Sequence, residues 1–171
     1  MAEDIARKSF EVKAKAINEE NGERRITFVA SSNGLDRHDE RVDVKSLRLP
    51  LRSGGYVVVG EIPTTGVSGV DIPLMLNHSA DVVDVIGSVR KAYYIDDELV
   101  FEAGISKREI AQEVLMLMEE EHLSNAFSIT MTDFVYEDNT IYDAEVIEVS
   151  VVFRGANTEA RLLAIKSLLG G

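Results

Sequence analysis

The sequence predicts a fold of mixed α+β or mainly β class, a β-barrel or sandwich with two helices beside it. Strand-like patterns recur in many short segments, helical spacing occurs in only two, and strands and helices do not alternate regularly. With 171 residues, the chain is long enough for one well-buried core and short for two. We therefore expect a single domain over residues 1–171.

The first expected element is a β-hairpin. Between Phe10 and Val29, apolar residues partly alternate with charged ones, and Asn21-Gly22 separates the two runs. Asparagine and glycine both tolerate positive φ, which the tightest hairpin turns require. We therefore expect two antiparallel strands here.

Two polar segments follow the hairpin. Residues 31–43, SSNGLDRHDERVD, are rich in turn formers, and residues 52–71 contain five glycines. Such compositions are typical of surface loops, and the second loop is long enough to be functional or mobile.

Short strands are expected next. Residues 72–77 form an apolar run that ends at His78. Residues 85–92 and 98–103 carry β-branched or alternating patterns around an Asp96-Asp97 turn.

A helix is predicted from about residue 107 to residue 122. Ser106, followed three residues later by Glu109, fits a capping box. The apolar residues that then recur at helical spacing are Ile110, Val114, Leu117 and Met118.

Two more strands are expected over residues 125–135 and 141–153, joined by the turn Glu137-Asp138-Asn139. Asn157 can then cap a last helix. The apolar positions of that helix are Leu162, Leu163, Ile165 and Leu168.

Composition and charge exclude several classes of function. The formal net charge of -12 should repel a phosphate backbone, so nucleic acid is not an expected partner. The absence of cysteine excludes disulfides, thiolate metal sites and cysteine nucleophiles. The sequence shows neither a secretion signal nor a run approaching the ~20 apolar residues of a membrane span, and a bacterial cytosolic setting fits.

Three side chains are candidates for acyl-transfer chemistry. His78 ends an apolar run and precedes a polar turn, where an imidazole could face both the core and a substrate. Strand alternation puts Ser128 and Thr130 on one face and Phe127 on the other. Glu148 interrupts a β-branched run, so its carboxylate needs solvent or a partner such as an imidazole. A serine, a histidine and an acid held together are a known solution to acyl transfer.

Each candidate also has a purely structural interpretation. His78 could be a half-buried histidine with its hydrogen bonds satisfied, and the small residues beside Ser128 could serve packing. Glu148 could be a solvated glutamate on an edge strand. Glu145 is a competing carboxylate, but three positions along a strand should put it on the opposite face.

A metal site is the main rival to serine chemistry. His38 lies among carboxylates that could bind a hard or borderline cation, namely Asp36, Asp39, Glu40 and Asp43. The spacing matches neither an EF-hand nor HExxH, so a solvated charged loop is favoured. His122 follows three glutamates at the end of the predicted helix, where a cation interacts favourably with the dipole. The chain has no phosphate-loop, dinucleotide-binding or GxSxG pattern.

Several short motifs occur in a fixed order: LDR, IPLMLNHSADVVDVIGSV, a charged-apolar helix, NAFSITM and VIEVSVVFRGANTEA. In this order they resemble the tailed-phage prohead protease family, which is similar in fold to the herpesvirus assemblins. The resemblance spans roughly residues 26–165. It implies a serine endopeptidase on a small β-barrel of about six to seven strands surrounded by helices.

The resemblance also implies roles for individual residues. His78 matches the family histidine, and Ser128 matches the nucleophile in the strand after the long helix. Glu148 matches the acid of the family's E-x-S pattern, which continues here as Val149 and Ser150.

An arginine helps to build the oxyanion site of the herpesvirus relatives, and Arg154 occupies a similar place here. Two departures concern the geometry of that oxyanion site. Thr130 and Gly155 stand where the family often has glycine and proline.

By the same resemblance, no metal or organic cofactor is required. The implied substrates are segments of the scaffold protein, of the major capsid protein and of the chain itself, cleaved inside the procapsid in the bacterial host cytoplasm. A homo-oligomer is compatible with this interpretation. The alternatives are a non-catalytic module of the same fold that binds capsid or scaffold protein, and a metal-dependent hydrolase built on His38.

Overall fold

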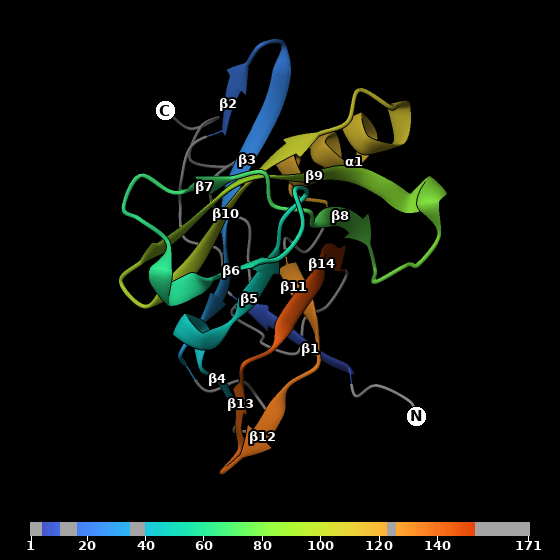
Figure 1. Cartoon of the computed structure of the whole chain (residues 1–171). Coiled ribbons are helices and arrows are strands. Elements are labelled where there is room, and N and C mark those ends of the chain that lie inside the picture. Colours follow the sequence, from blue (N-terminus) through green and yellow to red (C-terminus); the bar gives the residue numbers. More distant parts are fainter. Residues whose placement is uncertain (1–4, 11–16, 35–39, 123–125, 153–171) are drawn as a thin grey trace.

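Strands form most of the chain that the computed structural model describes, namely residues 5–10, 17–34, 40–122 and 126–152 (Figure 1). In chain order the strands are β1 (Ile5–Phe10), β2 (Ile17–Glu20), β3 (Glu23–Ser32), β4 (Arg41–Val42), β5 (Arg48–Pro50), β6 (Tyr56–Val58), β7 (Val67–Ser68), β8 (Pro73–Leu76), β9 (Val85–Ile95), β10 (Glu98–Ile105), β11 (Ala126–Thr132), β12 (Val135–Glu137), β13 (Thr140–Tyr142) and β14 (Glu145–Val152). The helical elements within these residues are the α-helix α1 (Glu109–Glu119) and the short 3₁₀ helices η1 (Val44–Ser46), η2 (Val59–Glu61) and η3 (Val82–Asp84). None of these helices is long and apolar enough to cross a membrane. The mainly β class is confirmed.

Most strands belong to one sheet that curls into a half-barrel (Figure 1). Neighbouring strands follow the order β1-β11-β14-β8-β9-β10-β3-β2, with β5, β6 and β7 attached beside this path. A second sheet has the order β12-β13-β4. A barrel of about six to seven strands and a likeness to the herpesvirus enzymes stay predictions.

The sheet makes neighbours of three strands that are far apart in the sequence. β11 pairs with β14 in the antiparallel sense, and β14 pairs with β8 in the parallel sense. A parallel pair cannot be closed by a tight hairpin, and the chain between β8 and β14 forms β9, β10, α1, β11 and the β12–β13 hairpin before it returns beside β8. This topology brings the segments around residues 78, 128 and 148 into one region.

The hairpin expected at Asn21-Gly22 is confirmed. β2 and β3 pair in the antiparallel sense, and the two turn residues have φ values of 54° and 78°. The expected start at Phe10 is wrong, because Phe10 ends β1, which pairs with β11 instead. The hairpin strand β2 begins at Ile17.

Residues 52–71 are attached to the fold more firmly than a surface loop would be. They include β6, η2 and β7, and they bury Val59, Ile62 and Val70. The amide of Arg52 donates to the carbonyl oxygen of Gly69 at 2.8 Å, which ties the two ends of the segment together. The many glycines concealed these buried apolar positions from a sequence-based interpretation.

The helix expected near residues 107–122 is present as α1, but the capping box is wrong. Arg108 occupies the N-cap position and makes no side-chain cap. The chain turns directly after β10, so Ser106 lies too early to cap the helix. Its hydroxyl accepts from the amide of Arg108 at 3.1 Å, and its carbonyl accepts from the side chain of Gln112 at 2.8 Å.

The two long strands expected near the C-terminal end of the described chain each divide in two. Asp133 and Asp143, both with positive φ, break them into β11 with β12 and β13 with β14. The Asp138-Asn139 turn joins β12 to β13, and this hairpin projects from the main sheet (Figure 1). The helix expected after Asn157 lies outside the described residues.

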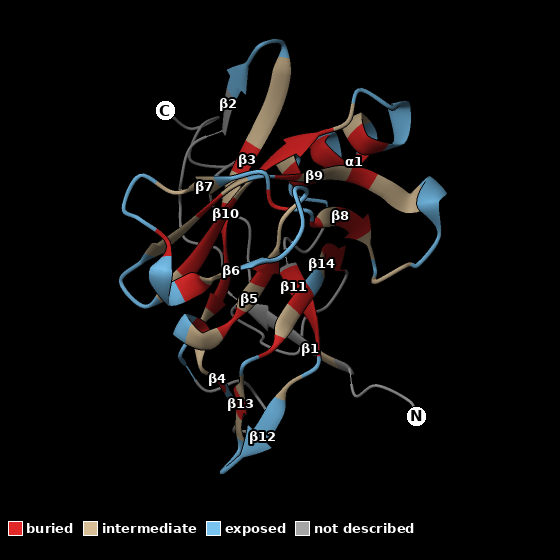
Figure 2. Cartoon of the chain, viewed as in Figure 1, coloured by how far each residue is buried: buried red, intermediate tan, exposed pale blue. Residues whose placement is uncertain are grey.

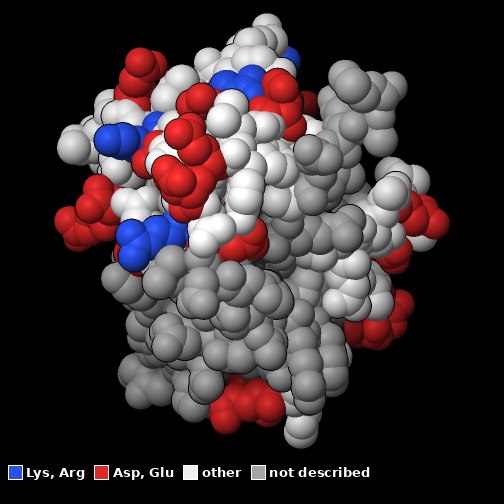
Figure 3. All heavy atoms as spheres, turned by 90° about the horizontal axis from the view of Figure 1, so that it is seen from below, with Lys and Arg blue, Asp and Glu red and all other residues white. Residues whose placement is uncertain are grey.

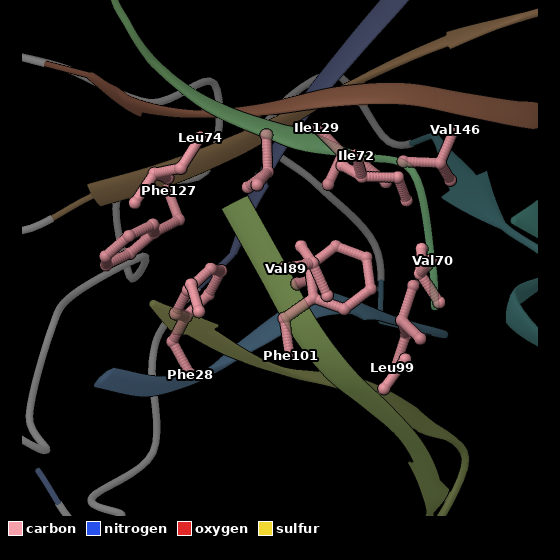
Figure 4. Packing of buried hydrophobic residues seen from close by; sticks show 14 of the residues in the cluster. Phe28, Val70, Ile72, Leu74, Val89, Leu99, Phe101, Phe127, Ile129 and Val146 are labelled. Atoms are coloured by element: carbon pink, nitrogen blue, oxygen red, sulfur yellow. The ribbon is translucent and has the colours of Figure 1, made fainter. Parts of the chain in front are cut away.

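The curled sheet encloses an apolar core, shown by the buried positions in Figure 2 and in close-up in Figure 4. The rings of Phe28 and Phe127 stack with centroids 3.9 Å apart, and Phe101 meets Phe28 edge-on at 6.2 Å. Phe28 lies on β3 and Phe127 on β11, near opposite ends of the strand order. This packing holds β11 against the core and thereby fixes the backbone position of the next residue, Ser128.

Candidate active site

Two neighbouring strands bring four polar side chains together. In the pairing of β11 with β14, Ser128 lies opposite Ser150 and Thr130 lies opposite Glu148. Directly opposite residues of an antiparallel pair point to the same face of the sheet. The four side chains therefore form a compact polar group on one face.

This face lies away from the core, as strand alternation predicted. Phe127 and Ile129 are 1% and 0% exposed and belong to the apolar core. Ser128 and Thr130 alternate with them and therefore point to the opposite side of β11.

His78 lies in a tight turn after β8. Asn77 and His78 have φ values of 48° and 57°, and the amide of Ser79 donates to the carbonyl of Leu76 at 2.9 Å. Positive φ at both central residues is typical of a type I′ turn, which favours asparagine and glycine. His78 occupies the second central position, which favours glycine, and its backbone conformation is therefore strained. Proteins retain such strain at functional sites.

Hydrogen bonds to β14 hold this turn in place. β8 runs parallel to β14 with Leu76 opposite Val151. The amide of Asn77 donates to the carbonyl of Val151 at 2.9 Å, and the amide of His78 donates to the hydroxyl of Ser150 at 2.9 Å. The imidazole is thereby directed over the polar group of β11 and β14.

The imidazole of His78 bridges a hydroxyl and a carboxylate. Its Nε2 atom lies 2.9 Å from Oγ of Ser128, and its Nδ1 atom lies 2.5 Å from Oε1 of Glu148. The side chains of His78 and Glu148 are 14% and 13% exposed, and Ser128 is 3% exposed. The three candidates singled out in the sequence are therefore in direct contact and largely shielded from water.

The carboxylate of Glu148 accepts hydrogen bonds on both oxygens. Oε1 accepts from Nδ1 of His78 and from the hydroxyl of Thr130, which also lies 2.9 Å from Nδ1. Oε2 accepts from the hydroxyl of Ser150 at 2.6 Å. Burial raises the pKa of Glu148, but these hydrogen bonds and the nearby imidazole together hold the pKa below its usual value.

This arrangement suits proton transfer from an alcohol. When Nδ1 donates its proton to a carboxylate, Nε2 of the same ring is left as an acceptor. An acceptor at hydrogen-bond distance from a serine hydroxyl can remove its proton as the oxygen attacks a carbonyl carbon. The geometry therefore fits acyl transfer through a serine nucleophile.

A β-bulge adjusts the position of Glu148. The pairing of β11 with β14 shifts between Thr130 and Met131, so that Met131 lies opposite Val146 and Ile147 is the extra residue. A bulge increases local twist and re-aims the neighbouring side chains. Ile147 is 37% exposed beside the carboxylate, although its neighbours on both sides are less exposed.

Two hollows lie along this face of the sheet. The one at the candidate site has a volume of about 330 Å³ and is lined by Pro73, Met75, His78, Ser79, Ala80, Thr130, Ile147 and Glu148. A larger one, of about 520 Å³, extends over β8, β9 and β10 and shares Pro73 with the first. Arg90 and Glu23 form an ion pair at 2.7 Å on its wall.

The surface charge agrees with the acidic composition. On the face shown in Figure 3, acidic side chains form several separate groups, with fewer basic side chains beside them. The formal net charge of the chain is -12.

The other candidates do not join the site. Glu145 lies opposite Thr132 and beside Arg48, so it is not the carboxylate against His78. The side chain of His122 is 70% exposed, with Nε2 3.9 Å from Glu120, and is a residue of the helix end, as expected.

Two of the candidate residues, Arg154 and His38, lie outside the residues that the structure describes. Among the residues that are described, no group of three or more histidine, aspartate or glutamate side chains could hold a metal ion.

Sequence reasoning missed two members of the polar group, Thr130 and Ser150. Thr130 was noted as a departure from the family glycine, and Ser150 as the last letter of the E-x-S pattern. Only the register between β11 and β14 reveals that both hydroxyls contact Glu148.

Comparisons with known proteins point to one group of enzymes. The family profile described as caudovirus prohead serine protease matches residues 31–168. Among solved structures, the bacteriophage T4 capsid assembly protease gp21 is similar, with a TM-score of 0.60 and 7% identity over 89% of this chain and 98% of that chain. At this identity the similarity concerns the fold alone. No curated protein matched the sequence.

Proposed function

The chain belongs to the caudovirus prohead serine protease family, and we propose that Ser128 is its nucleophile, His78 its general base and Glu148 the residue that orients the base. One observation supports this assignment most strongly. A continuous line of contacts runs from Oγ of Ser128 through the imidazole to Glu148, with distances of 2.9 Å and 2.5 Å.

The reaction that we propose uses these contacts. Oγ of Ser128 attacks the carbonyl carbon of a peptide bond while Nε2 of His78 takes the hydroxyl proton. The tetrahedral intermediate collapses, the C–N bond breaks, and His78 returns the proton to the leaving amine. Water then attacks the acyl-enzyme, with His78 again as base, which releases the carboxylic acid and restores the serine.

Glu148 is suited to support a charged imidazole during both steps. Its lowered pKa keeps it ionised at neutral pH. The hydroxyls of Thr130 and Ser150 hold its two oxygens in place, so the carboxylate fixes the tautomer and orientation of His78. Its negative charge offsets the positive charge that develops on the ring.

Membership of the family makes the chain a capsid maturation protease, and the substrates that we propose are segments of scaffold and major capsid protein and of the chain itself. The cleavages would occur inside the procapsid, within the bacterial host. The hollow beside His78 offers apolar contacts from Pro73, Met75 and Ile147 to the side chains of an extended peptide.

The decisive experiment compares Ser128→Ala with Ser31→Ala. Ser31 is also a fully buried serine, on β3, and its hydroxyl has no hydrogen-bond partner within the described part of the chain. A fluorophosphonate should label wild type and Ser31→Ala covalently, and should not label Ser128→Ala, although all three fold. Labelling of Ser128→Ala at the wild-type rate would show that the nucleophile is another residue.

A second candidate function is a non-catalytic module that binds capsid or scaffold protein. The observation that favours it is the 3% exposure of Ser128, which a structural serine would also show. In that case neither wild type nor Ser128→Ala reacts with the fluorophosphonate, and self-processing is the same in both.

A further inference from the structure

Ser150 occupies a special position in the polar group. It is fully buried on β14, directly opposite Ser128. Its hydroxyl accepts from the backbone amide of His78 at 2.9 Å and donates to Oε2 of Glu148 at 2.6 Å. One side chain thus joins the backbone of the histidine turn to the carboxylate that contacts the histidine ring.

The direction of both hydrogen bonds is fixed by chemistry. A backbone amide can only donate, so the oxygen of Ser150 must accept from His78. The single hydroxyl proton is then available for the ionised carboxylate of Glu148, which can only accept. Both partners are therefore satisfied in a site that is largely shielded from water.

We propose that Ser150 is a positioning residue of the peptidase, which holds the backbone of His78 and the carboxylate of Glu148 in fixed relation. This inference rests on the proposed function of the three residues that it supports. The strained positive φ of His78, 57°, makes such a restraint necessary, because the turn otherwise favours glycine at this position.

Thr130 provides a useful contrast. Its hydroxyl also donates to Glu148, but to the other oxygen, and it contacts the ring of His78 and not its backbone. Of the described groups that face this carboxylate, the imidazole is the titratable one, and the hydroxyls of Thr130 and Ser150 are the others. Removing the hydroxyl of Thr130 therefore tests the contacts to the carboxylate and the ring, while removing that of Ser150 tests the carboxylate and the backbone of the turn together.

The test begins with the variants Ser150→Ala and Ser150→Thr. Alanine leaves the amide of His78 without its acceptor and Glu148 without one donor, so fluorophosphonate labelling should slow by about 10²-fold. Threonine keeps the hydroxyl and should restore most of the rate. The carboxyl of Glu148, followed by carbon-13 NMR, should titrate at higher pH in Ser150→Ala than in wild type.

Two control variants separate positioning from general damage. Ser31→Ala removes a buried hydroxyl elsewhere and should change neither the labelling rate nor the titration of Glu148. Thr130→Val should raise the pH at which Glu148 titrates, but the amide of His78 should still exchange slowly with deuterated solvent. In Ser150→Ala that amide should exchange faster.

Hydrogen exchange in wild type tests the same point if Ser150→Ala does not fold. The amide of His78 should be protected although it lies in a turn, and rapid exchange would overturn the proposal. So would a Ser150→Ala protein that labels at the wild-type rate while Ser128→Ala is inert. Labelling of Ser128→Ala, in contrast, would overturn the proposed nucleophile itself.

Discussion

The Nδ1 atom of His78 lies 2.5 Å from Oε1 of Glu148, although the two residues are 70 positions apart in the sequence. The same carboxylate accepts from Thr130 on Oε1 and from Ser150 on Oε2. All three partners donate toward it. An ionised carboxylate can accept every one of these bonds, whereas a neutral amide must turn its NH₂ group toward at least one donor.

Glu148→Gln should therefore remove most of the peptidase activity while the protein still folds. The side-chain amide of glutamine cannot accept from His78 and from the hydroxyls of both Thr130 and Ser150. It also carries no charge to offset that of the ring. We expect labelling by a fluorophosphonate to slow by about 10³-fold or more. Glu145→Gln changes a half-buried carboxylate on the same strand and should label normally. Similar rates for the two variants would contradict the role of Glu148.

The lowered pKa of Glu148 predicts how stability depends on pH. A carboxyl whose pKa is lower in the folded state stabilises the protein above its unfolded pKa of about 4.3, and this contribution disappears as the pH falls through the folded pKa. The free energy of unfolding of wild type, minus that of Glu148→Gln, should fall as the pH drops below about 4.

Denaturant unfolding of both proteins across this pH range gives the measurement. The pKa of Glu23 is also lowered, chiefly by its hydrogen bond to Arg90. That contribution is common to both proteins and cancels in the difference. A difference that stays constant down to about pH 3 would contradict the assigned shift in Glu148.

Local chemistry explains which parts of the fold were predictable from the sequence. The Asn21-Gly22 turn is present as expected, because both residues readily adopt the positive φ that the turn requires, whatever surrounds them. The capping box at Ser106 was wrong because the end of β10 decides where α1 starts. Periodicity alone predicted strands that continue through Asp133 and Asp143. Both aspartates have positive φ, and the strands end there.

The candidate site depends on relationships that are not local. The resemblance to a known family selected Ser128, His78 and Glu148, and their catalytic roles stay predictions. No pattern within one segment reports that Thr130 pairs with Glu148, because the register and its bulge arise between two strands. For the same reason, the sequence could not show that Ser150 joins the two halves of the site.

Close backbone packing at the larger hollow predicts different effects for two glycines. A Cβ atom on Gly87 of β9 would overlap the backbone carbonyl oxygen of Gly104 on β10. A Cβ atom on Gly104 would meet the side-chain ends of Glu23 and Arg90. Flexible side chains can move aside, whereas a strand backbone cannot move without disturbing its neighbours.

Gly87→Ala should therefore lower the free energy of unfolding by more than Gly104→Ala. We expect about 3 kcal/mol or more for the first, and about 1 kcal/mol for the second, which weakens a surface ion pair. Gly22→Ala is a control for backbone strain, because φ is 78° and a Cβ atom there would meet only the end of the Lys107 side chain at van der Waals distance. Denaturant unfolding measures all three, and an equal loss at Gly87 and Gly104 would contradict the packing argument.

The exposed side chain of Ile147 predicts a separation of substrate binding from chemistry. Ile147 is the extra residue of the β-bulge, is 37% exposed, and lines the hollow beside His78. An extended substrate peptide can bury this side chain, whereas a small fluorophosphonate should bury much less of it. Ile147→Ser should therefore raise KM for the proposed scaffold or capsid-protein substrates by about tenfold and leave the fluorophosphonate rate almost unchanged. Ile95→Ser is the matched control, because Ile95 is 41% exposed at the far end of β9 and does not line the hollow. Equal KM values for the two variants would show that the peptide binds elsewhere. A slower fluorophosphonate reaction of Ile147→Ser would show instead that the residue matters for positioning Glu148.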